Sequence, residues 1–437
     1  MQELSEETPH QEILERIQEL LLEMSKNQLE NLEKQLRKKP VVEIVEQYLD
    51  THYEIRSNTV AHCFEYRRKQ SHEPFEQLNE DELFRELQKK KIFFGLNSLR
   101  SLLRSKFVSQ YDPIRAYFER LEHWQQGRDE DHIDKLASYV KARDPDRFRY
   151  HFKKHLVRAV ACVMLPQVYN KHCLVLIGRQ NDGKSSFCRF LSPPALRDYY
   201  AENIGTDKDS LIALTENFWI NLDELSTLSR SDINALKSVF SKDIVKVRRP
   251  YDSKTTSTHR IASFLGSTDR YEFLSDEAGS VRWLCFEEEG IDFNYTQDCD
   301  INQVYAQAYQ LFKDGFKYDL SRQDIEESEN VNREYQITTP EMDLLQRYYQ
   351  PGNPENPADF MTATEVTTEL VRASENKVKI LPRDVGKALK FLGYPKGQLR
   401  KAGTFPIKGY YIQRIDSLSN YEKDNHSPIP EKQEVPF

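Results

Sequence analysis

The sequence predicts an α/β fold in which helices cover a mostly parallel sheet. Four short apolar runs carry this prediction, at 174–177, 218–222, 261–266 and 281–286. Polar segments of helix length separate the runs, and strands connected in this way lie parallel in a covered sheet. The loop after the first run supports the prediction, because it has the glycine spacing of phosphate-binding loops in such sheets. The length of 437 residues leaves room for a module on each side.

Two segments precede the predicted sheet domain. In residues 1–40 apolar side chains recur at helical spacing until Pro40, which predicts an amphipathic helical arm. The arm either forms a coiled coil or packs on its own chain. Residues 41–146 predict a helical and mixed N-terminal domain, with short strands at 53–56 and 63–67.

The N-terminal domain also contains a predicted basic helix at 97–107, after a helix that opens at 79–82. A basic helix that follows another helix either contacts a DNA duplex or presents an exposed face on a packed helix. The basic cluster is short, which favours the exposed face.

The predicted sheet domain covers residues 147–330. A helix at 148–166 leads into the first strand, and residues 300–330 are helical again. A helix and linker follow at 331–359, because 351–357 is rich in proline, glycine and asparagine.

The C-terminal pattern predicts a winged-helix-like module at 360–415. Thr362 opens a capped helix, a second helix covers 382–392, and 401–411 indicates a β-wing. Two helices and a wing form a duplex-binding shape that also serves in protein contacts. We expect the polar tail 416–437 to be disordered.

Charge and composition exclude several classes of protein. A formal net charge of -8 argues against a uniformly basic nucleic-acid coat, although such a sum hides local patches. No stretch approaches the roughly 18 uncharged apolar residues of a membrane span, and the N-terminus is too polar for a secretory signal. Six cysteines without a C-x-x-C pair offer no zinc site and suit a reducing cytosol. We therefore expect a cytoplasmic protein.

The loop at 178–185 has the form G-x-x-x-x-G-K-S and predicts a site for ATP or a related triphosphate. Glycines let the backbone approach a phosphate, and the next helix's N-terminus favours an anion. Lys184 would reach the β- and γ-phosphate oxygens, and Ser185 would bind Mg²⁺. The alternative is a strand, a turn and a solvated lysine. The predicted nucleotide contacts are Gly178, Arg179, Gln180, Asn181, Asp182, Gly183, Lys184, Ser185 and Ser186.

Two carboxylates end the second apolar run. Asp223 would bind Mg²⁺ together with Ser185, and Glu224 would polarise the attacking water. Alternatively, these acids cap the following helix, which is a frequent arrangement. The upstream phosphate loop favours the catalytic interpretation.

Two further positions complete the predicted catalytic set. Asp269 follows the third apolar run, where a polar group can sense a γ-phosphate. Arg282 lies in the fourth run, where it would reach the γ-phosphate of a neighbouring subunit in an oligomer. The alternative for Arg282 is a structural ion pair with Glu277 or Asp276.

This ordered set resembles the virulence-associated protein E (VirE/VapE) family, within the AAA+ and superfamily 3 helicase group. The resemblance covers about 147–317 and includes L-I-G-R-Q-N-D-G-K-S-S, N-L-D-E-L, V-K-V-R-R-P-Y-D, F-L-G-S-T-D and E-F-L-S-D-E-A-G-S-V-R-W. It implies an AAA+-type P-loop ATPase that acts in replication of a phage, satellite or integrated element. It also implies a primase, which is often fused to such an ATPase or encoded separately. Residues 1–146 show no primase motif.

Two positions depart from the family pattern. The family usually has asparagine where this chain has Asp269, and often a double arginine where it has Val281 and Arg282. A carboxylate near the γ-phosphate repels it unless Mg²⁺ or a proton neutralises the charge. Asp269 therefore predicts weaker hydrolysis. Val281 leaves Arg282 as the one arginine of the pair.

A basic segment lies between the second and third apolar runs. In superfamily 3 helicases a hairpin at this location projects into a central channel, so the resemblance implies contact with single-stranded DNA. Basic residues beside an aromatic ring suit a single strand, because they follow the phosphates and offer a stacking face. Alternatively, the arginines pair with acids and the tyrosine packs. The predicted contacts are Lys246, Arg248, Arg249, Tyr251 and Lys254.

The C-terminal module is also basic. Residues 372–414 contain eleven Lys and Arg against Glu375 and Asp384. Such an excess on a winged-helix-like module predicts contact with double-stranded DNA. The predicted contacts are Lys387, Lys390, Arg400 and Lys401.

These motifs together predict an ATP-dependent DNA helicase or loader-type ATPase that works as a homo-oligomeric ring, such as a hexamer, with ATP and Mg²⁺. One alternative is a nucleotide-dependent DNA-binding switch or defence protein that does not translocate, which Asp269 and the single Arg282 favour. A small-molecule kinase explains neither basic segment.

Overall fold

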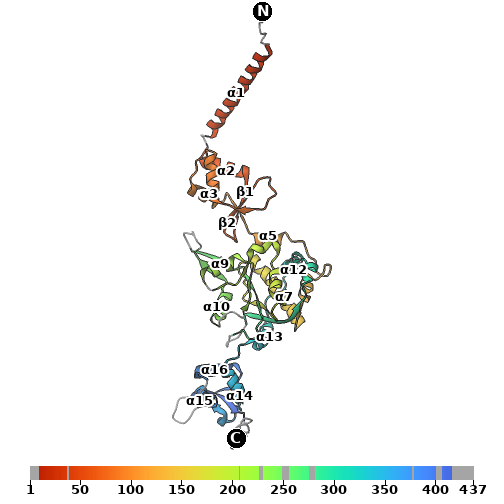
Figure 1. The fold of residues 1–437 in the computed structure, drawn as a ribbon, viewed down its shortest axis with the longest axis vertical. Coiled ribbons are helices and arrows are strands. Elements are labelled where there is room, and N and C mark those ends of the chain that lie inside the picture. The colour runs from red at the N-terminus through yellow and green to blue at the C-terminus, as the bar shows by residue number, and fades with distance from the viewer. Residues whose placement is uncertain are drawn as a thin grey trace, which may run out of the picture. The chain divides into compact units, whose positions relative to one another are not determined.

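The computed structural model describes residues 9–36, 39–205, 207–225, 230–248, 255–274, 281–375, 378–399 and 406–415. The chain is a mixed α/β protein that divides into two compact units, Met1–Glu119 and Arg120–Phe437 (Figure 1). Arg249, Tyr251, Lys254, Arg400 and Lys401 lie outside the described residues. In the part of the chain that the structure describes, no helix has the length and apolar character needed to cross a membrane.

The first unit begins with α1 (Pro9–Leu36), which confirms the helix expected in the N-terminal arm. Its large apolar side chains are exposed, among them Leu21 and Leu22 at 60% and Leu29 at 59%. The described side chains of α1 at 16–31 are all exposed, so they show no packing on their own chain. Pairing with another helix stays a prediction.

The rest of the first unit is a small sheet with helices. Its elements are α2 (Val41–His52), β1 (Tyr53–Asn58), β2 (Cys63–Arg68), β3 (Glu76–Gln77), α3 (Glu80–Lys89), α4 (Leu96–Leu103), β4 (Ser109–Tyr111) and α5 (Pro113–Glu119). The sheet order is β3-β2-β1-β4, and Asn79 caps α3 through the backbone N–H groups of its first turn. The predicted basic helix at 97–107 is too long. Because α4 ends at Leu103, Arg104 and Lys106 lie beyond it.

The second unit is built on a six-stranded sheet of order β5-β12-β6-β11-β8-β7. Its strands are β5 (Val140–Ala142), β6 (Cys173–Ile177), β7 (Tyr200–Glu202), β8 (Trp219–Leu222), β11 (Ser263–Thr268) and β12 (Trp283–Ile291). The five strands from β12 to β7 are parallel, and β5 is antiparallel to β12. The mostly parallel sheet expected from the apolar runs is therefore confirmed.

Helices cover both faces of this sheet. They are α6 (His132–Ser138), α7 (Pro145–Met164), α8 (Lys184–Phe190), α9 (Lys208–Glu216), α10 (Arg230–Phe240), α11 (Tyr295–Asp298), α12 (Ile301–Lys313) and α13 (Arg322–Asn332). Alternate residues of β6, Cys173 and Val175, join the apolar cluster that contains side chains of α9 and α10. Figure 1 shows α7 and α12 on the other side of the sheet. The strands are buried on both faces, which explains why their sequences are continuously apolar.

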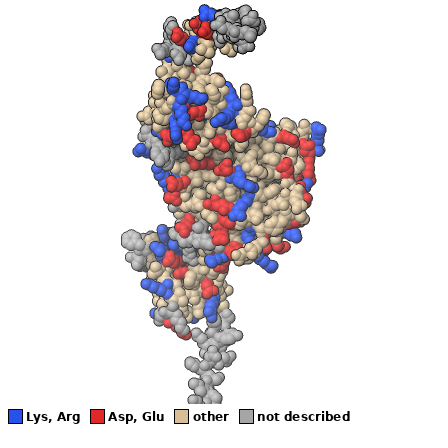
Figure 2. Space-filling model, turned by 45° about the horizontal axis from the view of Figure 1, so that its top comes forward, with Lys and Arg blue, Asp and Glu red and all other residues tan. Residues whose placement is uncertain are grey.

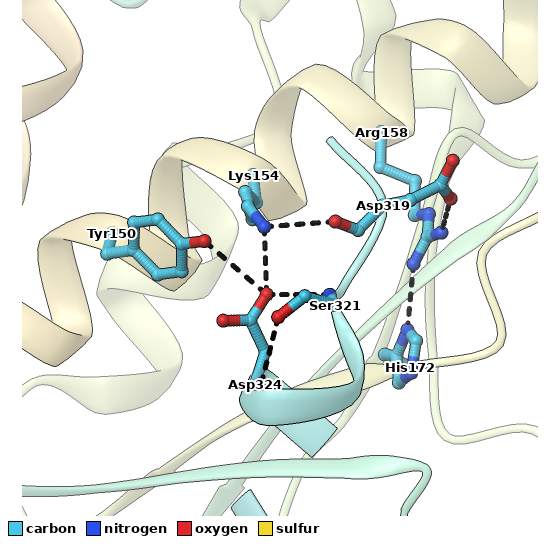
Figure 3. Close-up of polar contacts among 7 residues, drawn as sticks. All are labelled: Tyr150, Lys154, Arg158, His172, Asp319, Ser321 and Asp324. Atoms are coloured by element: carbon cyan, nitrogen blue, oxygen red, sulfur yellow. Dashed lines mark hydrogen bonds and ion pairs between the residues drawn. The ribbon is translucent and has the colours of Figure 1, made fainter. Parts of the chain in front are cut away.

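Basic side chains of α7 hold the start of α13 (Figure 3). Lys154 Nζ donates to Asp324 Oδ2 at 2.9 Å, and Arg158 forms an ion pair with Asp319. Arg158 also lies 2.9 Å from His172 Nδ1. Burial, followed by the charge of Arg158, lowers the pKa of His172 to about 2, so the neutral imidazole accepts this hydrogen bond. The two ion pairs and the hydrogen bond to His172 thus anchor segments far apart in sequence.

A buried arginine lies close to the same end of the sheet, beside the segment that leads into β6. The Arg260 side chain is 1% exposed and donates to main-chain carbonyl oxygens of five residues. They are Asn170, Val239, Phe240, Lys242 and Ala262. Val239 and Phe240 end α10, so the guanidinium satisfies carbonyls that the helix leaves without partners. Burial lowers the pKa of Arg260 to about 10, and the side chain stays charged at neutral pH.

The second unit ends in a group of helices and strands with its own apolar cluster. These elements are α14 (Pro340–Tyr348), β13 (Tyr349–Pro351), β14 (Phe360–Met361), α15 (Ala363–Ala373), α16 (Pro382–Phe391), β15 (Lys396–Leu399) and β16 (Ile407–Arg414). Thr362 and Glu365 form the expected capping box, and β15 pairs antiparallel with β16. The Gly352 N–H donates to Tyr411 O at 2.9 Å, so residues expected in a linker are bonded to β16.

All six cysteines lie in the described part of the chain, and none of them forms a disulfide bond there. Cys63 is half-buried, whereas Cys162, Cys173, Cys188, Cys285 and Cys299 are buried. Burial raises the pKa of each of these five thiols, for example to about 11 at Cys162 and about 12 at Cys188.

Candidate active site

The glycine-rich loop lies between β6 and α8, as the sequence predicts. Gly183 has a φ of +92°, and a Cβ there would lie 2.5 Å from the Phe293 ring. Both observations require glycine at this position, because left-handed torsion and close approach are each unfavourable for other residues. Asn181 also has a positive φ, of 69°. Both positions thus use left-handed torsions, which also occur in backbone turns that bind anions.

Lys184 is buried at the first position of α8, with 7% of the residue exposed. Its ammonium group donates to Gly178 O at 2.9 Å and also to Arg179 O. Both acceptors are carbonyls of the loop itself, so the lysine folds back onto the loop. Hydrogen bonds from an ammonium group to an anion are stronger than those to neutral carbonyls, so Lys184 can exchange these carbonyls for an anion.

Ser185 and Asp223 meet across the carboxyl edge of the sheet. The Ser185 hydroxyl donates to Asp223 Oδ1 at 2.7 Å, and the Ser267 hydroxyl donates to the same oxygen. Asp223 follows β8 and Ser267 lies on β11, which is the parallel neighbour of both β6 and β8. A hydroxyl and a carboxylate are hard oxygen ligands of the kind Mg²⁺ prefers. Their proximity fits the predicted Mg²⁺ site.

Glu224 has a backbone conformation that is uncommon for its residue type. Its φ is +52°, and its N–H donates to Asp223 Oδ1 at 3.2 Å. A left-handed torsion costs a glutamate roughly 1–2 kcal/mol. Such strain concentrates at functional sites, where it directs a side chain. Glu224 lines the same cavity as the loop.

One cavity of about 550 Å³ brings most of the predicted residues together. This volume lies within the ordinary range for small-ligand sites, about 300–1,000 Å³. Its walls consist of Gln180, Asn181, Gly183, Lys184, Ser185, Ser186, Asp223, Glu224, Ser267, Thr268, Asp269, Arg270 and Phe293. Among the predicted loop contacts, Gly178, Arg179 and Asp182 are not in these walls.

Several wall residues were not predicted from the sequence. Ser267 and Thr268 occupy the end of β11, and Arg270 follows Asp269. The fourth is Phe293, whose ring is 51% exposed beside the loop. An aromatic residue between Asp292 and Asn294 in a polar turn was the available signal. An exposed ring beside a phosphate-type loop offers a flat surface for a nucleotide base.

Asp269 and Arg282 have different positions relative to the cavity. Asp269 is exposed directly after β11 and lines the cavity, where the sequence placed it. Arg282 precedes β12 at the end next to Cys173, which is the far end of the sheet from the loop. Arg282 Nε donates to Ser241 Oγ at 3.0 Å. Arg282 is therefore remote from the cavity of its own subunit, and its role toward a neighbouring subunit stays a prediction.

The basic segment forms a hairpin. β9 (Ile244–Val247) and β10 (Thr256–His259) pair antiparallel, and Lys246 and Arg248 are exposed. Val245 and Val247 are buried and alternate with the exposed Lys246 and Arg248. The described part of the hairpin thus presents basic side chains on one face.

The two described residues among the predicted duplex contacts of the C-terminal module lie on α16. Lys387 and Lys390 are exposed, and Lys387 forms an ion pair with Asp384 at 3.3 Å. Figure 2 shows Lys and Arg interspersed with Asp and Glu over the face drawn there. That face has no uniformly basic coat, in agreement with the net charge of -8.

The fold and the cavity define an α/β protein whose polar site lies at the carboxyl edge of a parallel sheet, where such folds place their ligands. Residues 119–337 match the family model of the virulence-associated protein E-like domain, which covers half of the chain. The chain therefore belongs to the virulence-associated protein E-like family.

Comparison with solved structures finds the NrS-1 C-terminal region. The apo structure of this region is 11% identical in sequence to this chain. The match covers 84% of this chain and 98% of that chain, with a TM-score of 0.48. Two A-form apo structures of the same region are 10% and 12% identical at the same coverage, with TM-scores of 0.46 and 0.44. No curated protein matches the chain.

Proposed function

We propose that this protein is an ATP-dependent DNA helicase or loader-type ATPase of mobile-element replication. The observation that carries the proposal is the single cavity that brings together Lys184, Ser185, Asp223 and Glu224. The strand order β12-β6-β11-β8-β7 supports an AAA+-type P-loop domain, and family membership supports the replication role. The two helices and hairpin at the C-terminus support a winged-helix-like module.

Five wall residues have a part in the proposed reaction. Lys184 would leave the loop carbonyls for the β- and γ-phosphate oxygens, and Phe293 would stack on the base. Ser185 and Asp223 would hold Mg²⁺, which neutralises phosphate charge when it is bound. Glu224 would orient the attacking water and accept its proton.

Replacement of Glu224 by glutamine tests this function. We expect Glu224→Gln to bind ATP like the wild type but to hydrolyse it about a hundredfold more slowly, because the amide cannot accept the proton of the water. Phosphate release measures turnover, and a fluorescent nucleotide measures affinity. Unchanged phosphate release by the variant would remove Glu224 from the mechanism, and absence of phosphate release by the wild type would remove the proposed ATPase.

The DNA partner is the second part of the proposal. Exposed Lys246 and Arg248 on the β9–β10 hairpin would contact single-stranded DNA, and the basic C-terminal module would contact duplex. A homo-oligomeric ring and a separately encoded primase complete the proposed assembly.

Charge removal on the hairpin separates these contacts. We expect Lys246→Ala with Arg248→Ala to abolish stimulation of ATP turnover by single-stranded DNA while duplex binding is retained. Lys208→Ala, an exposed lysine on α9, is the matched control and should behave like the wild type. Both DNA affinities should fall with rising salt, since phosphate contacts release counterions. Equal loss of duplex binding in the double variant would contradict the division of contacts.

Asp269 in the cavity wall favours a second candidate, a nucleotide-dependent switch or defence protein that does not translocate. A carboxylate there opposes a γ-phosphate, which suits binding better than rapid turnover. Strand separation by the wild-type protein would exclude this candidate, whereas ATP-dependent DNA binding without separation would support it.

A further inference from the structure

A buried carboxyl group lies beneath the glycine-rich loop. Glu288, on β12, is 2% exposed, and neither of its carboxylate oxygens has a hydrogen-bond partner among the described residues. A Cβ at Gly178 would lie 1.9 Å from Glu288 Oε1, so the first glycine of the loop makes room for this group. The nearest cation is Lys184, whose Nζ lies 3.8 Å from Glu288 Oε1.

We propose that Glu288 is a positioning residue for Lys184: its ionised carboxylate holds the lysine back on the loop and competes with nucleotide phosphates for the ammonium group. This inference rests on the proposed nucleotide site. The separation of 3.8 Å is too long for a strong hydrogen bond but gives substantial attraction between buried charges. A phosphate that binds Lys184 adds negative charge close to the same carboxylate.

The charge state of Glu288 then controls affinity. Burial is the main cause that raises the pKa of Glu288 to about 7, and the negative charge of Asp182 adds to this rise. The positive charge of Lys184 acts in the opposite direction and lowers the pKa. Both forms of the carboxyl group are therefore populated at neutral pH. The charged and titratable groups near Glu288 on the loop, on β12 and on adjoining segments are Lys184, Asp182, Tyr271, Glu287 and Arg143.

Binding of phosphate favours the protonated form, because ionised Glu288 repels it. Affinity for nucleotide is therefore highest below pH 7 and falls as the pH rises through about 7. A change of one pKa unit on binding corresponds to a tenfold loss of affinity, which sets the expected size of the effect at roughly tenfold.

The test compares magnesium ADP binding by the wild type, Glu288→Gln and the control Glu289→Gln at pH 6 and pH 8. Glu289 is the exposed neighbour on the same strand. We expect the wild type and Glu289→Gln to lose about tenfold in affinity between the two pH values. Glu288→Gln should keep the low-pH affinity throughout, because its amide does not titrate. Titration of the ADP phosphates affects binding to all three proteins equally, so differences between the proteins do not arise from the ligand.

Two outcomes overturn the proposal. One is the same pH slope in Glu288→Gln as in the wild type. The other is weaker binding by this variant at both pH values, which shows a packing role only. A second measurement needs no variant: calorimetry of the wild type at pH 7 in buffers of different ionisation enthalpy should show net proton uptake on binding. Zero uptake also overturns it. If the wild type binds no nucleotide at all, the proposed function fails as well.

Discussion

Replacement of Lys184 by alanine is expected to lower the affinity for ATP about a hundredfold. The buried ammonium donates to loop carbonyls, and Lys184 is part of the cavity wall. Hydrogen bonds to charged groups contribute about 1.5–3 kcal/mol each, and about 2.7 kcal/mol corresponds to a hundredfold in affinity. A fluorescent ATP analogue measures the change directly.

Lys171→Ala is the matched control for this prediction. Lys171 is an exposed lysine that precedes β6 in the same domain, and it is not part of the cavity wall. Its removal should leave affinity unchanged. ATP affinity of Lys184→Ala equal to that of Lys171→Ala would show that the loop does not bind phosphate.

The second large effect is expected on stability, from Arg260→Met. Methionine retains the apolar volume but leaves the carbonyls of Asn170, Val239, Phe240, Lys242 and Ala262 without their donor. Each buried unsatisfied group costs about 1–3 kcal/mol. We therefore expect the free energy of unfolding of the second unit to fall by about 3 kcal/mol or more.

Tryptophan fluorescence follows this change selectively. The three tryptophans, Trp124, Trp219 and Trp283, all belong to the second unit. Arg189→Met is the control, because Arg189 is an exposed arginine whose ion pair with Glu202 lies on the surface. A denaturation midpoint in Arg260→Met equal to that of the control would contradict the structural role of the buried guanidinium.

The sequence predicts the sheet domain well because its signals are local. Continuous apolar runs mark strands buried on both faces, and the five parallel strands confirm that prediction. The loop motif and the Asp223–Glu224 pair each follow a strand, so their convergence at one edge follows from parallel topology. The residue at which a helix ends is less clearly marked in the local sequence. α4, for example, ends at Leu103, whereas the sequence predicts a helix to residue 107.

The missed residues depend on contacts between distant segments. Glu288 belongs to three consecutive glutamates, and only its position against Gly178 of the glycine-rich loop distinguishes it as the buried one. Ser267 became relevant because β11 lies beside β8, which brings its hydroxyl to Asp223. No spacing in the sequence encodes these neighbours.

The distribution of the six thiols has a practical consequence for work on oligomers. Thiolate is the reactive form, and burial keeps five of the six cysteines protonated and shielded. Half-buried Cys63 is thus the one thiol of the six placed to react first with a maleimide dye or to cross-link two copies of the chain. A fluorophore attached there labels the first unit of the native sequence, so subunit exchange can be followed by energy transfer without removal of any cysteine.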